Sequence, residues 1–294
     1  MTPRRTRHPD PTVIGPGTFR WGERTFIVGI LNVTPDSFSG DGLLAHADVI
    51  DRAVAQARRM VEEGADLLDI GGESTRPGHI AVDVAEEIDR VVPVLRAVRA
   101  ALPATPLSID TTKPAVAEAA LAAGADLLND IWGTGAQPAM VELAADRHAP
   151  VLLMHNRAVA RYDDVVAEVI ADLGGAIERA VRLGVAEGDI VVDPGIGFGK
   201  TADHNVTLLR GLAALGSLGR PVLLGTSRKS TLGRILDLPP DQRLEATLAT
   251  TALGVASGID LVRVHDVQAN VRTARVADAI IRATWHAGSE GGPP

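Results

Sequence analysis

Three polar side chains with the chemistry to recognise a nitrogen-rich ring stand where short apolar runs of this sequence end. Asp110, Asn129 and Asp193 each follow a stretch of aliphatic residues. A carboxylate or amide in such a place is poorly solvated unless it meets hydrogen-bond donors. A 2-amino-4-oxo pyrimidine ring offers these donors in its amino group and ring N–H. The alternative is that the three residues cap helices or tie together the rim of the fold.

Cationic side chains stand at two further strand ends. The segment Thr226–Ser230 opens a predicted helix, whose N–H groups and dipole favour an anion, with Lys229 adding charge and Ser230 a hydroxyl. Its alternative role is an ordinary helix cap at Ser227. Alternation places Arg263 and His265 on one face of the last strand. A buried arginine must meet an anion or a ring, or alternatively a buried aspartate.

The loops near these residues are rich in glycine or unusually long. The segment Asp193–Lys200 matches neither the P-loop nor the dinucleotide-binding spacing. Its glycines would let the backbone approach a flat ligand, with Phe198 beside it, and Lys200 is assigned no role. Long loops at 32–46 and 71–82 carry Asp36, Asp41, Glu73 and Arg76. We expect them to close over a substrate, the alternative being mobile surface loops.

Eight short aliphatic runs recur along the chain, each followed by a longer segment with helical periodicity. Each run is bounded by Gly, Pro or Asp and is too short for a typical helix, which predicts buried parallel strands. The runs are Phe26–Asn32, Ala65–Gly72, Pro106–Thr111, Asp126–Ile131, Pro150–Asn156, Asp189–Gly195, Pro221–Ser227 and Asp260–Asp266. Between them, Val84–Ala101 and Asp163–Leu183 carry apolar residues on one helical face.

Polar residues gather at the carboxyl ends of these runs, which favours a closed barrel over an open sheet. They are Asn32, Asp110, Asn129, His155, Asp193, Ser227, Arg263 and His265. In a barrel these ends converge on one mouth, whereas in an open sheet they would spread along an edge. The sequence therefore predicts an α/β fold, a single (β/α)₈ TIM barrel with long loops after strands 1 and 2.

Composition narrows the remaining choices. The chain has 294 residues, a formal net charge of −8 and no cysteine, which excludes disulfides and cysteine nucleophiles. Without a long basic run or an apolar run of about 20 residues, neither nucleic acid nor a membrane is an expected partner. We expect a flexible N-terminal segment at 1–20, a barrel at 21–286 and a disordered tail at 287–294. We expect a cytoplasmic location.

The motifs together resemble the dihydropteroate synthase family, in family order over residues 25 to 285. Gly29-Ile-Leu-Asn-Val-Thr-Pro-Asp-Ser-Phe-Ser39 and Asp69-Ile-Gly-Gly-Glu-Ser-Thr-Arg-Pro-Gly78 are long and specific matches. Shorter matches are Ser108–Thr111, Asn129-Asp130, Met154-His155, Asp193–Lys200, Ser227–Lys229 and Arg263–Val267. The resemblance implies condensation of (7,8-dihydropterin-6-yl)methyl diphosphate with 4-aminobenzoate in folate biosynthesis, Mg²⁺ as cofactor, and a homodimer.

The resemblance also implies roles for particular residues. The pterin-binding residues would be Asp110, Asn129, Asp193 and Lys229, with Met154 lining the pocket. The diphosphate would be met by Asn32, Thr75, Arg263 and His265, with Asn32 as the Mg²⁺ ligand. Arg263 would also stack on the pterin. Mg²⁺, Arg263, His265 and Arg76 would neutralise the departing diphosphate, while Asp110 and Asp193 would favour the electron-poor ring. The 4-aminobenzoate site would combine the two long loops with Lys229 and Ser230.

Two departures from the family pattern leave alternatives. The first loop reads Ser39-Gly40-Asp41-Gly42, which shifts its carboxylate by one residue, and Asn156-Arg157-Ala158-Val159 replaces the usual stretch after His155. The alternatives are a non-catalytic pterin-binding paralogue and a corrinoid-linked methyltransferase that uses methyltetrahydrofolate. The methyltransferase would not need Thr34–Phe38, Thr75-Arg76 or Ser227–Lys229.

Overall fold

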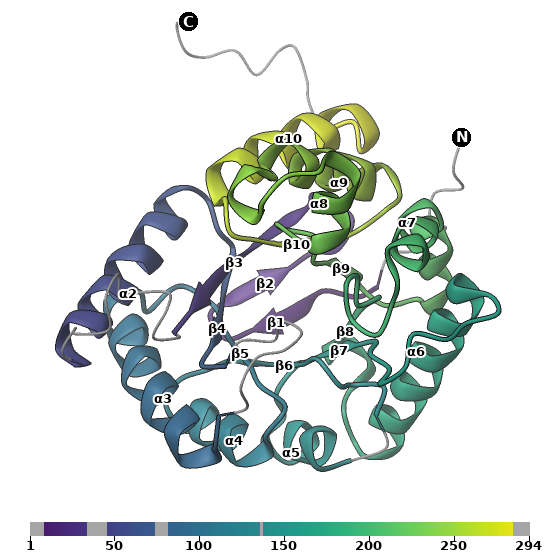
Figure 1. The fold of residues 1–294 in the computed structure, drawn as a ribbon. Helices are drawn as coiled ribbons and strands as arrows, with labels where there is room; N and C mark the ends of the chain where they lie inside the picture. Colours follow the sequence, from purple (N-terminus) through teal and green to yellow (C-terminus); the bar gives the residue numbers. More distant parts are fainter. Residues whose placement is uncertain (1–8, 34–45, 74–81, 136–137, 285–294) are drawn as a thin grey trace, which may run out of the picture.

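Eight parallel strands form the centre of the molecule in a computed structural model that describes residues 9–33, 46–73, 82–135 and 138–284. Figure 1 shows the strands inside a ring of helices. The strands are β3 (Phe26–Asn32), β4 (Leu67–Gly71), β5 (Leu107–Asp110), β6 (Leu127–Asp130), β7 (Val151–Met154), β8 (Ile190–Asp193), β9 (Leu223–Leu224) and β10 (Leu261–Val264). All eight predicted strands are confirmed.

The sheet closes on itself. Its hydrogen-bonded order is β8-β7-β6-β5-β4-β3-β10-β9, and a parallel bridge between Val192 and Val222 joins the two edges. Closure brings the carboxyl ends of all strands to one rim. The TIM barrel predicted from the sequence is confirmed.

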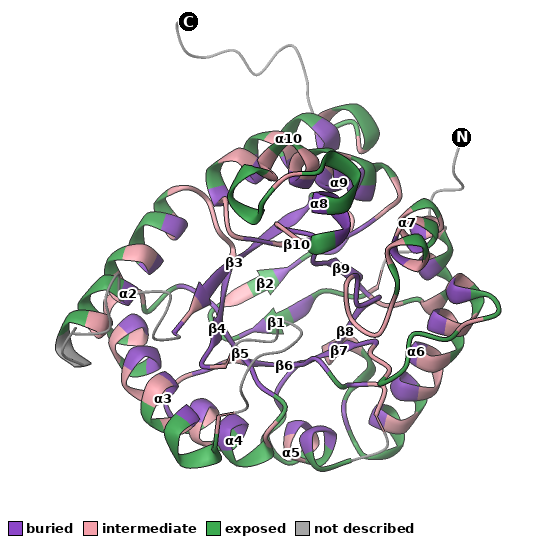
Figure 2. Ribbon diagram, viewed as in Figure 1, coloured by how far each residue is buried: buried purple, intermediate pink, exposed green. Residues whose placement is uncertain are grey.

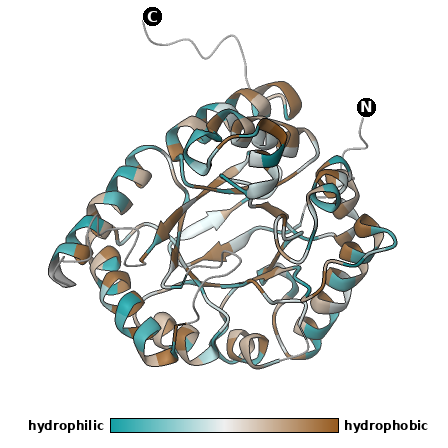
Figure 3. Ribbon diagram, viewed as in Figure 1, coloured by the Kyte–Doolittle hydropathy of each residue, from teal (hydrophilic) through white to brown (hydrophobic). Residues whose placement is uncertain are grey.

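Helices cover the outside of the barrel with their apolar faces inward, as the burial colours in Figure 2 show. Hydrophobic colour follows the strands in Figure 3, while the outer sides of α2 and α3 are hydrophilic. The α-helices are α2 (His46–Glu62), α3 (Val84–Ala101), α4 (Pro114–Ala122), α5 (Ala139–Arg147), α6 (Val165–Arg182), α7 (Ala202–Arg210), α8 (Ser230–Leu236), α9 (Leu244–Ala256) and α10 (Val267–Ile281). Short 3₁₀ helices are η1 (Glu187–Asp189), η2 (Leu212–Leu218) and η3 (Pro240–Gln242).

A Gly-X-Asp segment connects a helix to the amino end of a strand at three places, Gly64–Asp66, Gly124–Asp126 and Gly258–Asp260. Gly124 and Gly258 have φ of +108° and +88°, a conformation that suits glycine at a helix end. The aspartate two residues later accepts a hydrogen bond from the neighbouring strand. Asp126 binds the N–H of Leu107 at 2.9 Å, and Asp260 binds that of Val222 at 2.9 Å. These joints therefore stabilise the end of the barrel opposite the predicted site.

A two-stranded hairpin packs against that same end. Strands β1 (Thr12–Ile14) and β2 (Gly17–Phe19) pair antiparallel, and Ile14 and Phe19 are buried in a cluster with Leu127 and Leu261 from inside the barrel. This corrects the expectation of a flexible segment over 1–20 where residues 9–20 are concerned. Residues 1–8 and the predicted tail at 287–294 lie outside the described residues.

Candidate active site

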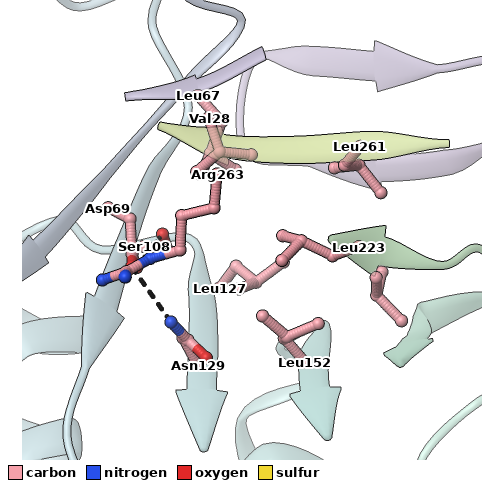
Figure 4. A pocket seen from close by; sticks show the side chains of 11 residues that line it. Val28, Leu67, Asp69, Ser108, Leu127, Asn129, Leu152, Leu223, Leu261 and Arg263 are labelled. Carbon is pink, nitrogen blue, oxygen red and sulfur yellow. Dashed lines mark hydrogen bonds and ion pairs between the residues drawn. The ribbon is translucent and has the colours of Figure 1, made fainter. Parts of the chain in front are cut away.

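The interior of the barrel changes from apolar to polar toward the carboxyl ends of its strands. Leucines from five strands form an apolar layer: Leu67, Leu127, Leu152, Leu223 and Leu261. The side chains of Arg263, Asp69 and Asn129 point toward one another in Figure 4. Period-two alternation along each strand produces this stacking, because residues two apart face the same way. The polar layer is therefore held on a packed base.

Arg263 forms the centre of the polar layer. Its Nε donates to Asp69 Oδ2 at 2.5 Å, and a terminal nitrogen donates to Asp110 Oδ2 at 2.7 Å. Asn129 Nδ2 donates to Asp69 Oδ2 at 3.0 Å, and Ser108 Oγ donates to Asp69 Oδ1 at 2.5 Å. The alternative of a buried Arg–Asp pair at Arg263 is thus realised, with two carboxylates sharing one guanidinium.

Asp110 retains an unused acceptor within this network. Its Oδ1 is buried and has no hydrogen-bond partner among the residues that the structure describes. An unpaired buried acceptor costs on the order of 1–3 kcal/mol, so such atoms commonly serve a ligand. Burial raises the pKa of Asp110 to about 7, with Arg263 opposing the rise and Asp69 adding to it. Asp110 is therefore placed to accept a hydrogen bond from a ring N–H or amino group.

Asp193 and Lys229 form a second charged group on the other side of the mouth. Asp193 Oδ1 accepts from the N–H of Gly195 at 2.7 Å. The Nζ of Lys229 donates to the carbonyl of Ile196 and lies 4.1 Å from the centroid of the Phe198 ring. Burial lowers the pKa of Lys229 to about 8, with Asp193 opposing the fall, and burial raises the pKa of Asp193. Lys229 and Phe198, both predicted for this site, lie together.

The glycines of the Asp193–Lys200 segment allow close approach to the protein's own chain. A Cβ on Gly195 would lie 1.9 Å from the carbonyl oxygen of His155, and one on Gly197 would lie 2.9 Å from Lys229 Cδ. Both glycines have positive φ, +67° and +84°. The sequence explains these glycines by the approach of a flat ligand. The structure adds a second reason, which is the close contact of the turn with His155 and Lys229.

Ser227 and His265 pair across the ends of β9 and β10. Ser227 Oγ lies 2.9 Å from His265 Nδ1 and accepts from the His265 N–H at 3.2 Å. The residue before α8 is Lys229, which makes no side-chain cap, so the alternative of Ser227 as the helix cap is wrong. Ser230 is the first residue of α8 and is exposed. Ser227 therefore orients His265 at the mouth.

Asn32 ends β3 beside the polar layer and is half-buried. A Cβ built on Gly71 would lie 3.9 Å from Asn32 Oδ1 and 3.5 Å from Asp110 Cβ. An amide oxygen suits Mg²⁺, which commonly takes one or two protein oxygens together with substrate phosphates. No cluster of three histidine or acidic residues with metal-binding geometry occurs in the described part of the chain. The donor set at this mouth therefore fits a Mg²⁺ ion carried largely by a diphosphate.

A third charged cluster anchors the start of the second long loop. Lys113 donates to the carboxylates of Glu73 and Glu87, with Nζ 2.5 Å from Glu87 Oε2. Glu87 lies in α3 with its side chain 1% exposed. Arg90 of the same helix donates to the carbonyl of Gly72 at 3.0 Å. The end of β4 is therefore held by α3 and by the turn before α4.

The structure corrects one predicted position and adds residues that the sequence interpretation missed. His155 does not join the mouth: its Nε2 lies 3.1 Å from Asp172 of α6, outside the strands. Asp69 was missed as a site residue, although a lone carboxylate inside the apolar run Leu67–Ile70 could have revealed it. Met154 is buried and pairs in register with Asp193. The predicted positions Thr75 and Arg76, and the loop residues Asp36 and Asp41, lie outside the described residues.

The mouth thus combines three kinds of group: acceptors that could bind a ring, cationic side chains, and the hydroxyl of Ser227. Asp110, Asn129 and Asp193 supply acceptor oxygens, while Arg263 and Lys229 supply positive charge. No protein nucleophile is needed if an electron-rich ring itself expels an anionic leaving group. The arrangement can bind a flat heterocycle and stabilise negative charge that departs from it.

Comparisons with known proteins agree with this geometry. Residues 28–265 match the family model described as pterin binding enzyme. The dihydropteroate synthase of Bacillus subtilis is 46% identical over 266 residues, 90% of this chain and 92% of that protein. A Clostridium difficile dihydropteroate synthase structure, determined in the presence of pteroic acid, has a TM-score of 0.86 at 48% identity, covering 90% of this chain and 99% of that one. A Xanthomonas albilineans dihydropteroate synthase with 4-aminobenzoic acid has a TM-score of 0.83 at 45% identity, covering 90% and 94%.

Proposed function

The chain belongs to the pterin-binding enzyme family as a dihydropteroate synthase, and on this premise we propose how its residues divide the work. The reaction joins (7,8-dihydropterin-6-yl)methyl diphosphate to 4-aminobenzoate, giving 7,8-dihydropteroate and diphosphate. The observation that carries the assignment of residues is the polar layer at the strand ends. Asp110, Asn129 and Arg263 of this layer share the mouth with Asp193 and Lys229, and one buried acceptor atom of Asp110 has no partner among the residues described.

In this proposal the pterin ring lies across the polar layer. Asp110 Oδ1 and Asp193 accept from the ring amino and N–H groups, and Asn129 and Lys229 complete the polar contacts. The support is complementarity: acceptor oxygens face a donor-rich ring edge, and two of them are held in place by Arg263 and Gly195. Met154 and Phe198 provide apolar contact with the ring.

The diphosphate would lie above the ring, toward Asn32 and His265. The charge of Arg263 is already matched by Asp69 and Asp110, so Arg263 serves better to stack on the pterin and orient it than to bind a free anion. We therefore assign diphosphate binding to Asn32, His265, Thr75 and Arg76, and contact with the pterin face to Arg263. Mg²⁺ held by Asn32 and the diphosphate would neutralise the departing charge.

The reaction then requires the protein to orient the two substrates, and it needs no protein nucleophile. The C–O bond to the diphosphate breaks, and its electron pair leaves with the phosphate oxygen. The resulting methylene cation is conjugated with the dihydropterin ring. The amine of 4-aminobenzoate attacks that carbon and loses a proton. Ionised Asp110 and Asp193 beside the ring favour the electron-poor state electrostatically. The 4-aminobenzoate would bind near Lys229, Ser230 and the two long loops.

A turnover assay tests the assignment. We expect sustained diphosphate release when the pterin diphosphate, 4-aminobenzoate and Mg²⁺ are all present, with 7,8-dihydropteroate formed in equal amount. The similarity to synthases disfavours the methyltransferase alternative. A protein that binds the pterin but releases no diphosphate would instead support the non-catalytic alternative.

We also propose that the protein is a homodimer. Helices α9 and α10 expose apolar side chains that no described residue covers: Leu253 is 65% exposed, Val276 62% and Ile280 74%. Adjacent exposed apolar groups of this kind are typical of association surfaces. Among the described helices, none is long and apolar enough to cross a membrane. The cytoplasmic location stays a prediction from the sequence.

A further inference from the structure

Lysine is rare in this chain and is found in buried polar clusters. Only three of its 29 Lys and Arg residues are lysines, namely Lys113, Lys200 and Lys229. Lys113 binds two glutamates and Lys229 lies in the pterin site, whereas Lys200 has no role in the proposed reaction. Because arginine occupies the other cationic positions, the presence of a lysine at 200 calls for a reason specific to its contacts.

The ammonium of Lys200 donates hydrogen bonds to the loop after β8 and to one histidine. Nζ donates to the carbonyl oxygens of Gly195 and Phe198, both at 3.0 Å, and lies 2.9 Å from His155 Nδ1. An ammonium has three donors, and these three acceptors use them, while the carbonyl oxygen of His155 lies further away at 3.5 Å. Lys200 therefore ties both ends of the 195–198 turn to the end of β7.

His155 links Lys200 to a carboxylate, that of Asp172 in α6. Because Nδ1 accepts from Lys200, the ring proton lies on Nε2, which donates to Asp172 Oδ2 at 3.1 Å. Burial lowers the pKa of His155 to about 4, so the ring is neutral at neutral pH, as an acceptor must be. Arg157 holds the same Asp172 at 2.8 Å. We call Lys200, His155 and Asp172 the loop clamp.

The loop held by the clamp carries the partners of two pterin-site residues. The N–H of Gly195 donates to Asp193 Oδ1, the carbonyl of Ile196 accepts from Lys229, and the Phe198 ring lies beneath the Lys229 ammonium. We propose that Lys200 is a positioning residue: its ammonium fixes the 195–198 turn against β7 and thereby sets the positions of Asp193 and Lys229 for the pterin. This inference rests on the proposed pterin site.

Burial of Lys200 disfavours the charged form of its amine. Burial is the main cause that lowers the pKa of Lys200, Lys229 and Arg157 also lower it, and Asp193 and Asp172 raise it, so that the pKa is about 7. Together with His155, these are the charged and titratable groups that act on its ammonium within the described residues. Below about pH 7 the ammonium keeps all three donors, and as pH rises the neutral amine loses one. The clamp should therefore weaken as pH rises through this range.

The test compares two cations that each bind backbone carbonyls at opposite ends of the barrel. Lys200→Met removes the clamp. Arg99→Met is the matched control, since Arg99 donates to the carbonyls of Gly124 and Thr105 and pairs with Asp126 at the far end. We expect Lys200→Met to weaken binding of 6-hydroxymethyl-7,8-dihydropterin by about tenfold or more in calorimetry, because small displacements of binding groups are costly. Arg99→Met should lower thermal stability and leave this affinity within about twofold.

A spectroscopic readout separates positioning from general destabilisation. With ¹³Cε-labelled lysine the protein has only three side-chain signals, and each Lys→Met variant identifies one. In Lys200→Met we expect the Lys229 signal to move while the Lys113 signal stays. Asp172→Asn, at a side chain 34% exposed, should weaken pterin binding in the same direction by a smaller factor and covers the case in which Lys200→Met does not fold.

The outcomes distinguish this inference from the function on which it rests. If the unmodified protein binds no pterin, the proposed site and the clamp both fail. If it binds pterin, but the folded clamp variants bind as tightly and the Lys229 signal is unmoved, the positioning role of Lys200 is overturned while the pterin site stands. Equal loss of affinity in Arg99→Met would also overturn it, because the effect would then follow stability alone.

Discussion

At the scale of single residues, Asp110 carries a cost in the folded protein that a hydrogen bond from a ligand would offset. Its Oδ1 is buried and has no partner in the described part of the chain, and its pKa is raised to about 7 chiefly by burial. A folded-state pKa above the unfolded value means that the folded state holds the proton more tightly. Any stability from the protonated form is therefore lost as pH rises from about 4 through 7, and ionised Asp110 opposes folding at pH 8.

Asp110→Asn should separate binding from stability. At pH 8 we expect pterin affinity to fall by about 2 kcal/mol, because a charge-assisted hydrogen bond is lost. Thermal stability at pH 8 should not fall, since the ionised buried carboxylate is removed and Asp69 still pairs with Arg263. Protonation of Asp110 should lower pterin affinity as pH drops through about 7, opposing the weakening of the loop clamp at higher pH, and in the variant only the dependence due to the clamp should remain. Calorimetry between pH 6 and 8.5 measures both effects.

The matched control is Asp126→Asn, which changes a carboxylate paired with Arg99 at the far end of the barrel. It should lose stability and keep the acid dependence of pterin binding. If Asp110→Asn retained both the affinity and its pH dependence, Asp110 would not contact the pterin.

Sequence reasoning at this scale found strand-end residues but not their partners. Asp110, Asn129 and Asp193 were predicted because a polar residue after an apolar run is conspicuous. Asp69 and Lys200 were missed because their roles depend on which strands become neighbours. His155 was placed at the mouth from its position at a strand end, yet its side chain lies on the outer face against Asp172. A shift of one residue reverses the face.

At the scale of elements, the joint between β4, α3 and α4 depends on one lysine. Lys113 pairs with Glu87, whose side chain is almost fully buried and whose Oε1 has no partner among the described residues. Removing one partner of a buried ion pair leaves an uncompensated charge, which costs more than the pair contributes. The ion pair between Lys113 and Glu87 therefore stabilises this joint only while both charged partners are present.

Lys113→Met should therefore destabilise the protein by about 3 kcal/mol, a typical cost for breaking a buried ion pair. Urea unfolding measures the change. Adding Glu87→Gln should recover part of the loss, because the uncompensated charge is removed. If the double variant were as unstable as the sum of the two single variants, the interpretation as a buried pair would be wrong.

The elements themselves show where periodicity suffices and where it does not. The run over Phe26–Asn32 and the helix over Val84–Ala101 match the structure at both ends. The β1–β2 hairpin was missed because strands of three residues contain too few positions to show alternation. Its stability comes from Ile14 and Phe19 packing against barrel leucines far along the chain.

At the scale of the whole molecule, closure of the sheet explains why one sequence pattern predicted both fold and site. Eight repeated strand–helix units bring their carboxyl ends to one rim, so polar residues far apart in sequence meet there. Arg263 reaches Asp69 across 194 residues of chain. The sequence pattern does not predict the outer surface in the same way. An apolar residue on a helix can be identified as exposed only after the helices have been placed on the barrel.

The homodimer is the remaining prediction at this scale. Helices α9 and α10 are tied by a hydrogen bond from Thr251 Oγ1 to Asn270 Oδ1 at 2.7 Å, and their outward faces expose Leu253, Val276 and Ile280. Val276 and Ile280 are four residues apart, so they share one face of α10. Three large apolar groups on two neighbouring helices would be covered if two copies met along this face.

Ile280→Glu should therefore convert a dimer into a monomer, because the new charge would lose its hydration in the interface. Sedimentation velocity at micromolar concentration measures the state of association. The matched control is Val159→Glu, which places the same charge at an apolar residue that is 70% exposed but lies in the loop after β7. That variant should remain a dimer. If the unmodified protein sediments as a single chain, or if Ile280→Glu stays dimeric, the apolar face of α9 and α10 is not the interface.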